Sequence, residues 1–188
     1  RDDGGLWHRY RDGHTLVPGQ LSDYAFMIHG LLELHAATFD FRYLESALRY
    51  NAFLSESFAD EAGGGYFMTG HAAENLIVRP KEFYDGAMPS GNSVQLLNLL
   101  RLARLTGRAE LDEQAAGLAK TLAGMAKTSP SNHAQALLGF AFAAAEPAEL
   151  VVVGPGREDG TRAMLDVARS VCRSGFVALL KDPDHADP

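Results

Sequence analysis

Apolar residues recur at helical spacing along most of this chain. Beginning at Ser22, they return every three or four positions to about residue 38, which predicts an amphipathic helix. The same period predicts helices from a cap at Asp40 to about residue 58, over residues 90–105 and 108–126, and over residues 131–145. The pattern therefore predicts a mainly α fold between residues 22 and 145.

The remaining segments follow other patterns. Residues 149–154 (ELVVVG) and 175–180 (GFVALL) are predicted to be strands that flank a helix over residues 159–172, and together they form a small parallel βαβ unit. Residues 1–20 are predicted to be loop or irregular extended chain, because they mix Gly, Pro, charged and aromatic residues. Residues 59–89 are predicted to be a long connection with a tight turn at GGGYF (63–67).

Two of the helical pairs are copies of one another. Residues 30–47 align with residues 98–115 without gaps, and each copy reads as helix, tight turn, helix. In the second copy Gly107 suits the left-handed end of a helix. The helix starts also align, which predicts a serine at each N-cap: Ser22, Ser90 and Ser131.

Tandem helical hairpins bury their apolar faces by stacking on one another. The first helix of each pair is apolar nearly all round and the second has a polar face, which predicts alternating inner and outer helices and hence an α/α toroid. A closed ring of six pairs needs roughly 330 residues, so we expect residues 1–146 to be a partial toroid and 147–188 a small tail. The chain begins with Arg1 rather than Met, so we interpret it as part of a longer chain. Either the missing remainder or a second copy in a dimer would then cover the uncovered helices.

Composition narrows the classes of partner. The chain has 188 residues, 46% of them hydrophobic, and a net charge of −7 from 17 basic and 24 acidic residues. Without a basic stripe, neither nucleic acid nor an anionic membrane is an expected partner. One cysteine, Cys172, fits a reducing compartment, so we expect a cytoplasmic location. His29 and Glu33 share a helix face, but two ligands do not make a metal site, so we expect neither metal nor cofactor.

Candidate chemistry gathers at the predicted inner-helix starts. Asp85 and Asp23 are the candidate catalytic carboxylates, and His133 is a candidate for proton transfer. Each has a structural alternative: Asp85 as a pin for its loop, Asp23 as a helix-dipole carboxylate, and His133 as a histidine without a catalytic partner. The candidate substrate-binding residues are Tyr24, Tyr66, Arg79, Ser90 and Asn92.

The segments LSDYAFMIHGLLELHAAT (21–38) and RPKEFYDGAMPSGNSVQLLNLLRLARLTG (79–107), with the GGGYF turn, resemble the YyaL-type thioredoxin-domain family, whose animal members are described as spermatogenesis-associated. The resemblance implies a preceding thioredoxin-like domain and a six-hairpin glycosidase-like toroid, of which this chain would be the later part. Such toroids are similar to those of N-acylglucosamine 2-epimerases and unsaturated glucuronyl hydrolases. The family's usual redox cysteine pair has no counterpart here, so the resemblance implies no redox role.

Two functions follow as hypotheses. One is a fragment of a carbohydrate-active toroid with epimerase-like or glycosidase-like acid–base chemistry, which is expected to be inactive as a fragment. The other is a non-catalytic scaffold that binds a protein partner or a thioredoxin-like domain. Convergence of Asp23, Asp85 and Asn92 in one concave pocket would favour the enzyme. Carboxylates occupied by local backbone amides would favour the scaffold.

Overall fold

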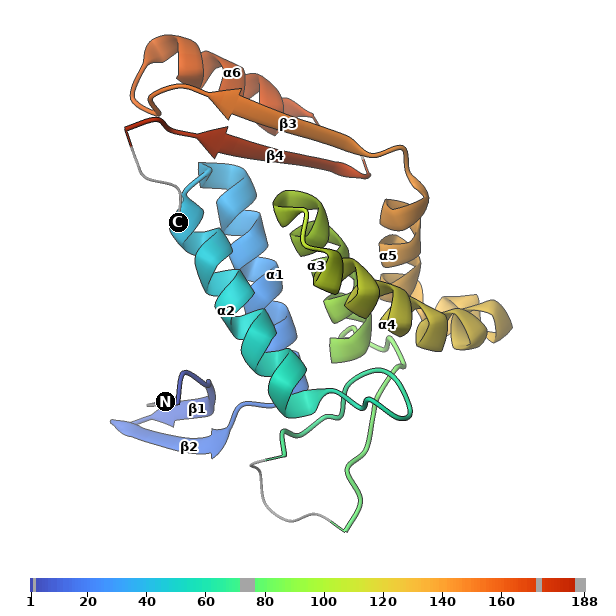
Figure 1. Ribbon diagram of the computed structural model, residues 1–188. Helices are drawn as coiled ribbons and strands as arrows, with labels where there is room; N and C mark the ends of the chain where they lie inside the picture. Colours follow the sequence, from blue (N-terminus) through green and yellow to red (C-terminus); the bar gives the residue numbers. More distant parts are fainter. Residues whose placement is uncertain (2, 72–76, 172–173, 185–188) are drawn as a thin grey trace.

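Helices in two layers make up most of the molecule in the computed structural model, which describes residues 1, 3–71, 77–171 and 174–184 (Figure 1). Helices α1 and α5 both pack against α3, while α2 packs on α1 and α4 packs on α3. The bounds of these helices are α1 Leu21–Thr38, α2 Phe41–Phe58, α3 Gly91–Thr106, α4 Ala109–Thr128 and α5 Ala134–Ala144. The predicted alternation of inner and outer helices is thus present for the two hairpins.

The core lies where α1 and α3 meet their outer partners. Leu96, Leu99 and Leu102 of α3 are fully buried, as are Ile28 and Leu32 of α1. At about 25 cal/mol for each Å² of apolar surface, burying one such side chain stabilises the fold by roughly 1.5–3 kcal/mol. Because α3 has neighbours on three sides, its side chains are apolar or hydrogen-bonded within the protein nearly all the way round the helix.

The internal repeat is visible in the hydrogen bonds that end the inner helices. The hydroxyl of Thr38 donates to the Leu34 carbonyl, and the hydroxyl of Thr106, 68 residues later, donates to the Leu102 carbonyl. The next residues, Phe39 and Gly107, are both left-handed C-caps, with φ of 58° and 65°. Glycine adopts this conformation without strain, whereas phenylalanine does so only when packing compensates.

A small unit lies across the C-terminal ends of α1 and α3 (Figure 1). Strands β3 (Ala148–Val153) and β4 (Phe176–Lys181) pair in parallel, with α6 (Asp159–Ser170) between them in sequence. This is the predicted βαβ unit. It has its own core of Val152, Leu165 and Ala168, into which Phe39 inserts from the end of α1.

The N-terminal segment differs from the prediction. Residues 1–20 contain an antiparallel hairpin of β1 (Trp7–Arg11) and β2 (His14–Pro18) rather than irregular chain alone. Asp12 and Gly13 form its two-residue loop, with φ of 52° and 82°. An Asp-Gly pair between strand-forming residues favours this turn, and the Gly and charged residues around it concealed the signal.

Two of the three predicted serine caps are wrong. The N-cap of α1 is Gln20, whose side chain and that of Asp23 form a reciprocal capping box. Ser131 lies in a 3-10 turn (Pro130–Asn132) and α5 begins after His133. Ser90 does cap α3, accepting from the Ser93 amide at 3.1 Å, and Asp40 caps α2. The aligned serines therefore mark the region of each helix start, but of the three only Ser90 is itself the cap.

Within the described part of the chain, no helix combines the length and the hydropathy that crossing a bilayer requires. The predicted end of the last helix at Cys172 lies outside the described residues.

Candidate functional site

The starts of α1, α3 and α5 lie together at one end of the molecule. A Cβ added to Gly91, the first residue of α3, would stand 3.2 Å from the Ser22 amide nitrogen of α1. The Asp85 carboxylate bonds both to the start of α3 and to the start of α5. The helix starts therefore share one end, as the sequence predicts.

Asp85 joins two of these helix starts through its own carboxylate. Its Oδ1 accepts from the Ser90 amide at 2.9 Å, and its Oδ2 accepts from the Gln135 and Ala136 amides at 2.9 and 3.2 Å. The residue is 9% exposed. Free amides at a helix start need such acceptors, and the positive end of the helix dipole favours a carboxylate there. Backbone amides thus occupy both oxygens of this candidate catalytic group.

The side chain of Asn92 bonds to the backbone of the long connection, as a neighbouring strand would. Its Oδ1 accepts from the Tyr66 amide at 2.8 Å, and its Nδ2 donates to the Tyr66 and Glu82 carbonyls at 3.0 and 2.8 Å. The Tyr66 side chain is buried, and this burial raises the pKa of its hydroxyl, which interacts with Ser55 and Gln95. Both candidate binding residues are thereby committed to holding the long connection against α3.

Asp23 and Tyr24 hold the N-terminal hairpin. Asp23 Oδ2 accepts from the Gln20 amide and lies 2.7 Å from His8 Nδ1. The Tyr24 hydroxyl accepts from the Leu6 amide at 2.7 Å, and its ring stacks on Phe53 with centroids 5.2 Å apart. Burial raises the pKa of this phenol. The partner of Asp23, His8, lies 15 residues away on the N-terminal hairpin, so only a prediction of that hairpin could have identified it.

The two basic candidates also bond to the backbone. Arg79 donates from Nε and Nη2 to the Thr69 carbonyl at 3.1 and 2.5 Å, and its guanidinium lies 4.2 Å from the Phe67 ring centroid. His133 Nδ1 lies 2.9 Å from the Ser129 carbonyl oxygen. Neither side chain bonds to Asp85 or Asp23, and no hydrogen bond joins these two carboxylates among the described residues.

An ion pair that the sequence did not indicate holds the tight turn predicted at GGGYF. Asp60 accepts from the Ala62 and Gly63 amides and pairs with Lys81 at 2.6 Å. The Lys81 hydrogen bond and these amides hold the pKa of the Asp60 carboxyl below its usual range. The pair fixes the turn to the far end of the long connection.

The most open surface near the helix starts is apolar. A shallow groove of about 730 Å³ runs along α1, and its sides include Leu6, Trp7 and Met88. Its floor on α1 is the surface that we call the open face: Met27, Gly30 and Leu34. Met27 and Leu34 are 44% and 45% exposed. Apolar side chains at this spacing on one helix are typical of a face that another helix covers.

Among the described residues, no group of three or more metal-ligating side chains is present. The hydrogen bonds of Asp85 and Asn92 form a network that positions helices, and an apolar groove lies beside it.

Comparison with known proteins gives similarity to one named group. Spermatogenesis-associated protein 20 of Rattus norvegicus is 32% identical over 167 residues, which is 88% of this chain, and the Mus musculus and Homo sapiens proteins of that name match equally. An uncharacterized Caenorhabditis elegans protein is 36% identical over 103 residues, 55% of this chain. This chain spans only 21% of the mammalian relatives and 14% of the nematode protein. No family model matches it.

Proposed function

We propose that this chain is a non-catalytic helical packing unit, part of an α/α toroid, whose open face binds an apolar helix of the rest of that toroid. The observation that carries the proposal is the use of Asp85: backbone amides of two different helices occupy both of its oxygens. A carboxylate so engaged serves as a structural pin rather than as a free acid or base.

The arrangement of the inner helices supports the toroid. Among the helices that the structure describes, α1, α3 and α5 form a row in which α3 alone has an inner neighbour on each side. The two helices at the ends of the row both expose apolar residues, namely Met27 and Leu34 on α1 and Leu137 and Leu138 on α5. A row that continues into a ring would cover these residues with further inner helices.

The open face has the shape that a helix partner needs. A Cβ added to Gly30 would meet nothing within 4 Å, so this glycine is not required by packing inside the chain. A glycine inside a helix costs about 0.5–1 kcal/mol relative to alanine. On an exposed apolar face, a glycine leaves room for another backbone to approach closely.

The length of the similar proteins suggests where such a partner helix comes from. The matched relatives are several times longer than this chain, which leaves room for further hairpins and for the thioredoxin-like domain expected of YyaL-type proteins. We therefore propose that the partner helix belongs to the rest of the longer protein. We also propose that this protein is cytoplasmic. Carbohydrate chemistry is less well supported, because backbone amides occupy both oxygens of Asp85 and one oxygen of Asp23.

Sedimentation velocity of the 188-residue chain tests the open face. We expect concentration-dependent association, because without its partner helix the face would pair with a second copy. Leu34→Lys should shift the chain to monomer, whereas Val167→Lys, at a 66% exposed position on α6, should not. A chain that stays monomeric at all concentrations, or that associates equally with both variants, would contradict the proposal.

Gly30→Ala gives a second test with a matched control. The substitution should raise the stability of the monomer by about 0.5–1 kcal/mol through helix propensity while weakening association. Gly117→Ala on α4, where an added Cβ also meets nothing within 4 Å, should give the same gain in stability and leave association unchanged. Equal effects of the two variants on association would refute close helix approach at Gly30.

A further inference from the structure

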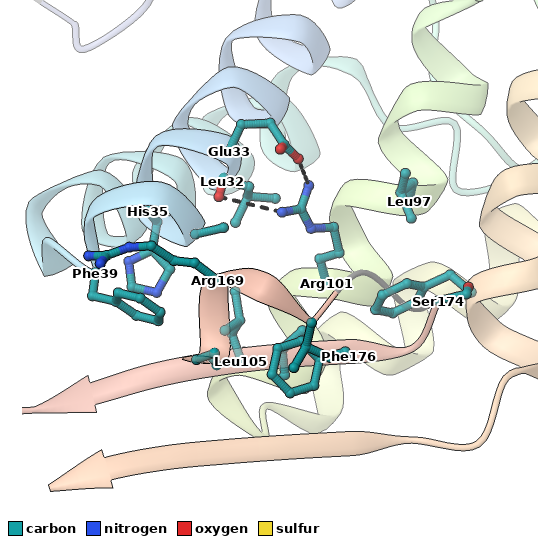
Figure 2. Close-up of a pocket in the computed structure, with 16 residues that line it drawn as sticks. Leu32, Glu33, His35, Phe39, Leu97, Arg101, Leu105, Arg169, Ser174 and Phe176 are labelled. Atoms are coloured by element: carbon teal, nitrogen blue, oxygen red, sulfur yellow. Dashed lines mark hydrogen bonds and ion pairs between the residues drawn. The ribbon is translucent and has the colours of Figure 1, made fainter. Parts of the chain in front are cut away.

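A second cavity lies at the opposite end of the helices, between the C-terminal part of α1 and the βαβ unit (Figure 2). Its volume is about 460 Å³, within the range of pockets that hold small organic molecules. Three phenyl rings line it: Phe39 from the end of α1, Phe142 from α5 and Phe176 from β4. None of the residues proposed above for catalysis or helix docking lines this cavity.

Two guanidinium groups also line the cavity. The Arg101 side chain is 14% exposed, donates from Nη1 to Glu33 at 2.5 Å and from Nη2 to the Leu32 carbonyl at 3.4 Å (Figure 2). A guanidinium carries five N–H donors, so three remain available on Arg101 within the described structure. Arg169 crosses from α6 to α1, where its Nε donates to the Ala37 carbonyl at 2.8 Å.

The charge balance of the cavity favours a single negative charge. Arg169 is already paired through Nη1 with Asp166, so among the described residues the opposing charges left in the lining are those of Arg101 and Glu33. Glu33 is exposed over 59% of its side chain, so its pairing with Arg101 is screened by solvent and yields to a better-buried anion. A monoanion that displaces Glu33 would neutralise Arg101, whereas a dianion such as a phosphate ester would leave an excess of negative charge.

His35 provides an acceptor without a partner. The residue is 2% exposed and lines the cavity. Its Nδ1 lies 3.3 Å from the Asp40 carbonyl oxygen, which can only accept, so Nδ1 carries the proton. Burial, and then the nearby Arg101, lower the pKa of the imidazole, which favours its neutral form. Its buried Nε2 is therefore a lone-pair acceptor, and no described residue bonds to it.

We propose that this cavity binds a small aromatic carboxylic acid that also carries a hydroxyl group. The carboxylate lies against the guanidinium group of Arg101, the ring packs among the phenylalanine side chains, and the hydroxyl donates to His35 Nε2. Paired N–H donors of a guanidinium match a carboxylate, and aromatic rings pack favourably against one another. This site is independent of the helix-docking function, because it lies at the other end of the helices.

Calorimetric titration of the chain with 4-hydroxyphenylacetate tests the site. We expect saturable binding, at least tenfold weaker binding of the uncharged 4-hydroxyphenylacetamide, and roughly threefold to tenfold weaker binding of phenylacetate, which lacks the hydroxyl. No binding of 4-hydroxyphenylacetate at millimolar concentration, or equal binding of all three compounds, would overturn the proposal.

Variants distinguish this site from adventitious binding. Arg101→Gln should weaken 4-hydroxyphenylacetate at least tenfold, and Glu33→Gln should strengthen it by removing the competing carboxylate. His35→Phe should bind phenylacetate and 4-hydroxyphenylacetate equally. Arg162→Gln, a 60% exposed position on α6, serves as the control and should change nothing. Thermal melts establish that each variant is folded. Folded variants of Arg101, Glu33 and His35 that all bind like the wild type would refute the assignment.

Discussion

The most direct test of the structural role of Asp85 is the substitution Asp85→Asn, which preserves shape and removes charge. In the structure Oδ1 accepts one amide hydrogen bond, from Ser90, and Oδ2 accepts two, from Gln135 and Ala136. An asparagine can present its carbonyl oxygen to only one of these groups. Its NH2 group must then face amides that themselves donate, which leaves buried N–H groups unsatisfied.

The magnitude follows from the bonds lost. A helix cap contributes about 1 kcal/mol, and hydrogen bonds to a charged group contribute about 1.5–3 kcal/mol each. Loss of one of the two caps together with the charge should therefore lower the free energy of unfolding by about 2–4 kcal/mol. For a chain of this length that corresponds to a decrease of roughly 4–16 °C in Tm.

Urea unfolding followed by circular dichroism measures this loss, with Asp12→Asn as the matched control. Asp12 lies in the hairpin loop with its side chain 85% exposed, and asparagine tolerates its φ of 52°. The control should change stability by no more than about 0.5 kcal/mol. If Asp85→Asn unfolds at the same urea concentration as the wild type, the carboxylate is not a pin and a proton-transfer role regains support.

Two further predictions concern the other end of the molecule. Burial lowers the pKa values of His35 and His29 in the folded chain, so the unfolded chain binds protons first as the pH falls. The free energy of unfolding should therefore be constant above about pH 6.5 and decrease below it, by up to about 1.4 kcal/mol per pH unit for each histidine. Urea titrations from pH 7.5 to 5 measure this decrease. A His35→Phe variant whose stability falls with pH as steeply as that of the wild type would contradict the prediction. Phe39→Ala should lower the free energy of unfolding by roughly 3–5 kcal/mol, because it leaves a cavity beside Val152, Leu165 and Ala168. Hydrogen exchange should show loss of amide protection in β3 and β4 before α2 and α4. A uniform loss of protection would refute this role for Phe39.

Local sequence rules were sufficient for the helical framework. The 3.6-residue period located the helices, the offset of 68 identified the paired hairpins, and Asp40 and Gly107 marked ends that the structure retains. These features depend on residues within one or two turns of each other, so a single segment contains their cause. The parallel βαβ unit followed for the same reason, since its topology allows few alternatives.

The tertiary structure alone decided what the polar side chains do. Asp85 accepts from amides 50 and 51 residues away, and no local pattern specifies which helix start a carboxylate will meet. The left-handed Phe39 is likewise stable only because a core formed more than 100 residues later surrounds it. Sequence determined where helices form, because that is a short-range property of the backbone. Packing determined which buried donors and acceptors meet, because each must find a partner wherever the fold brings one.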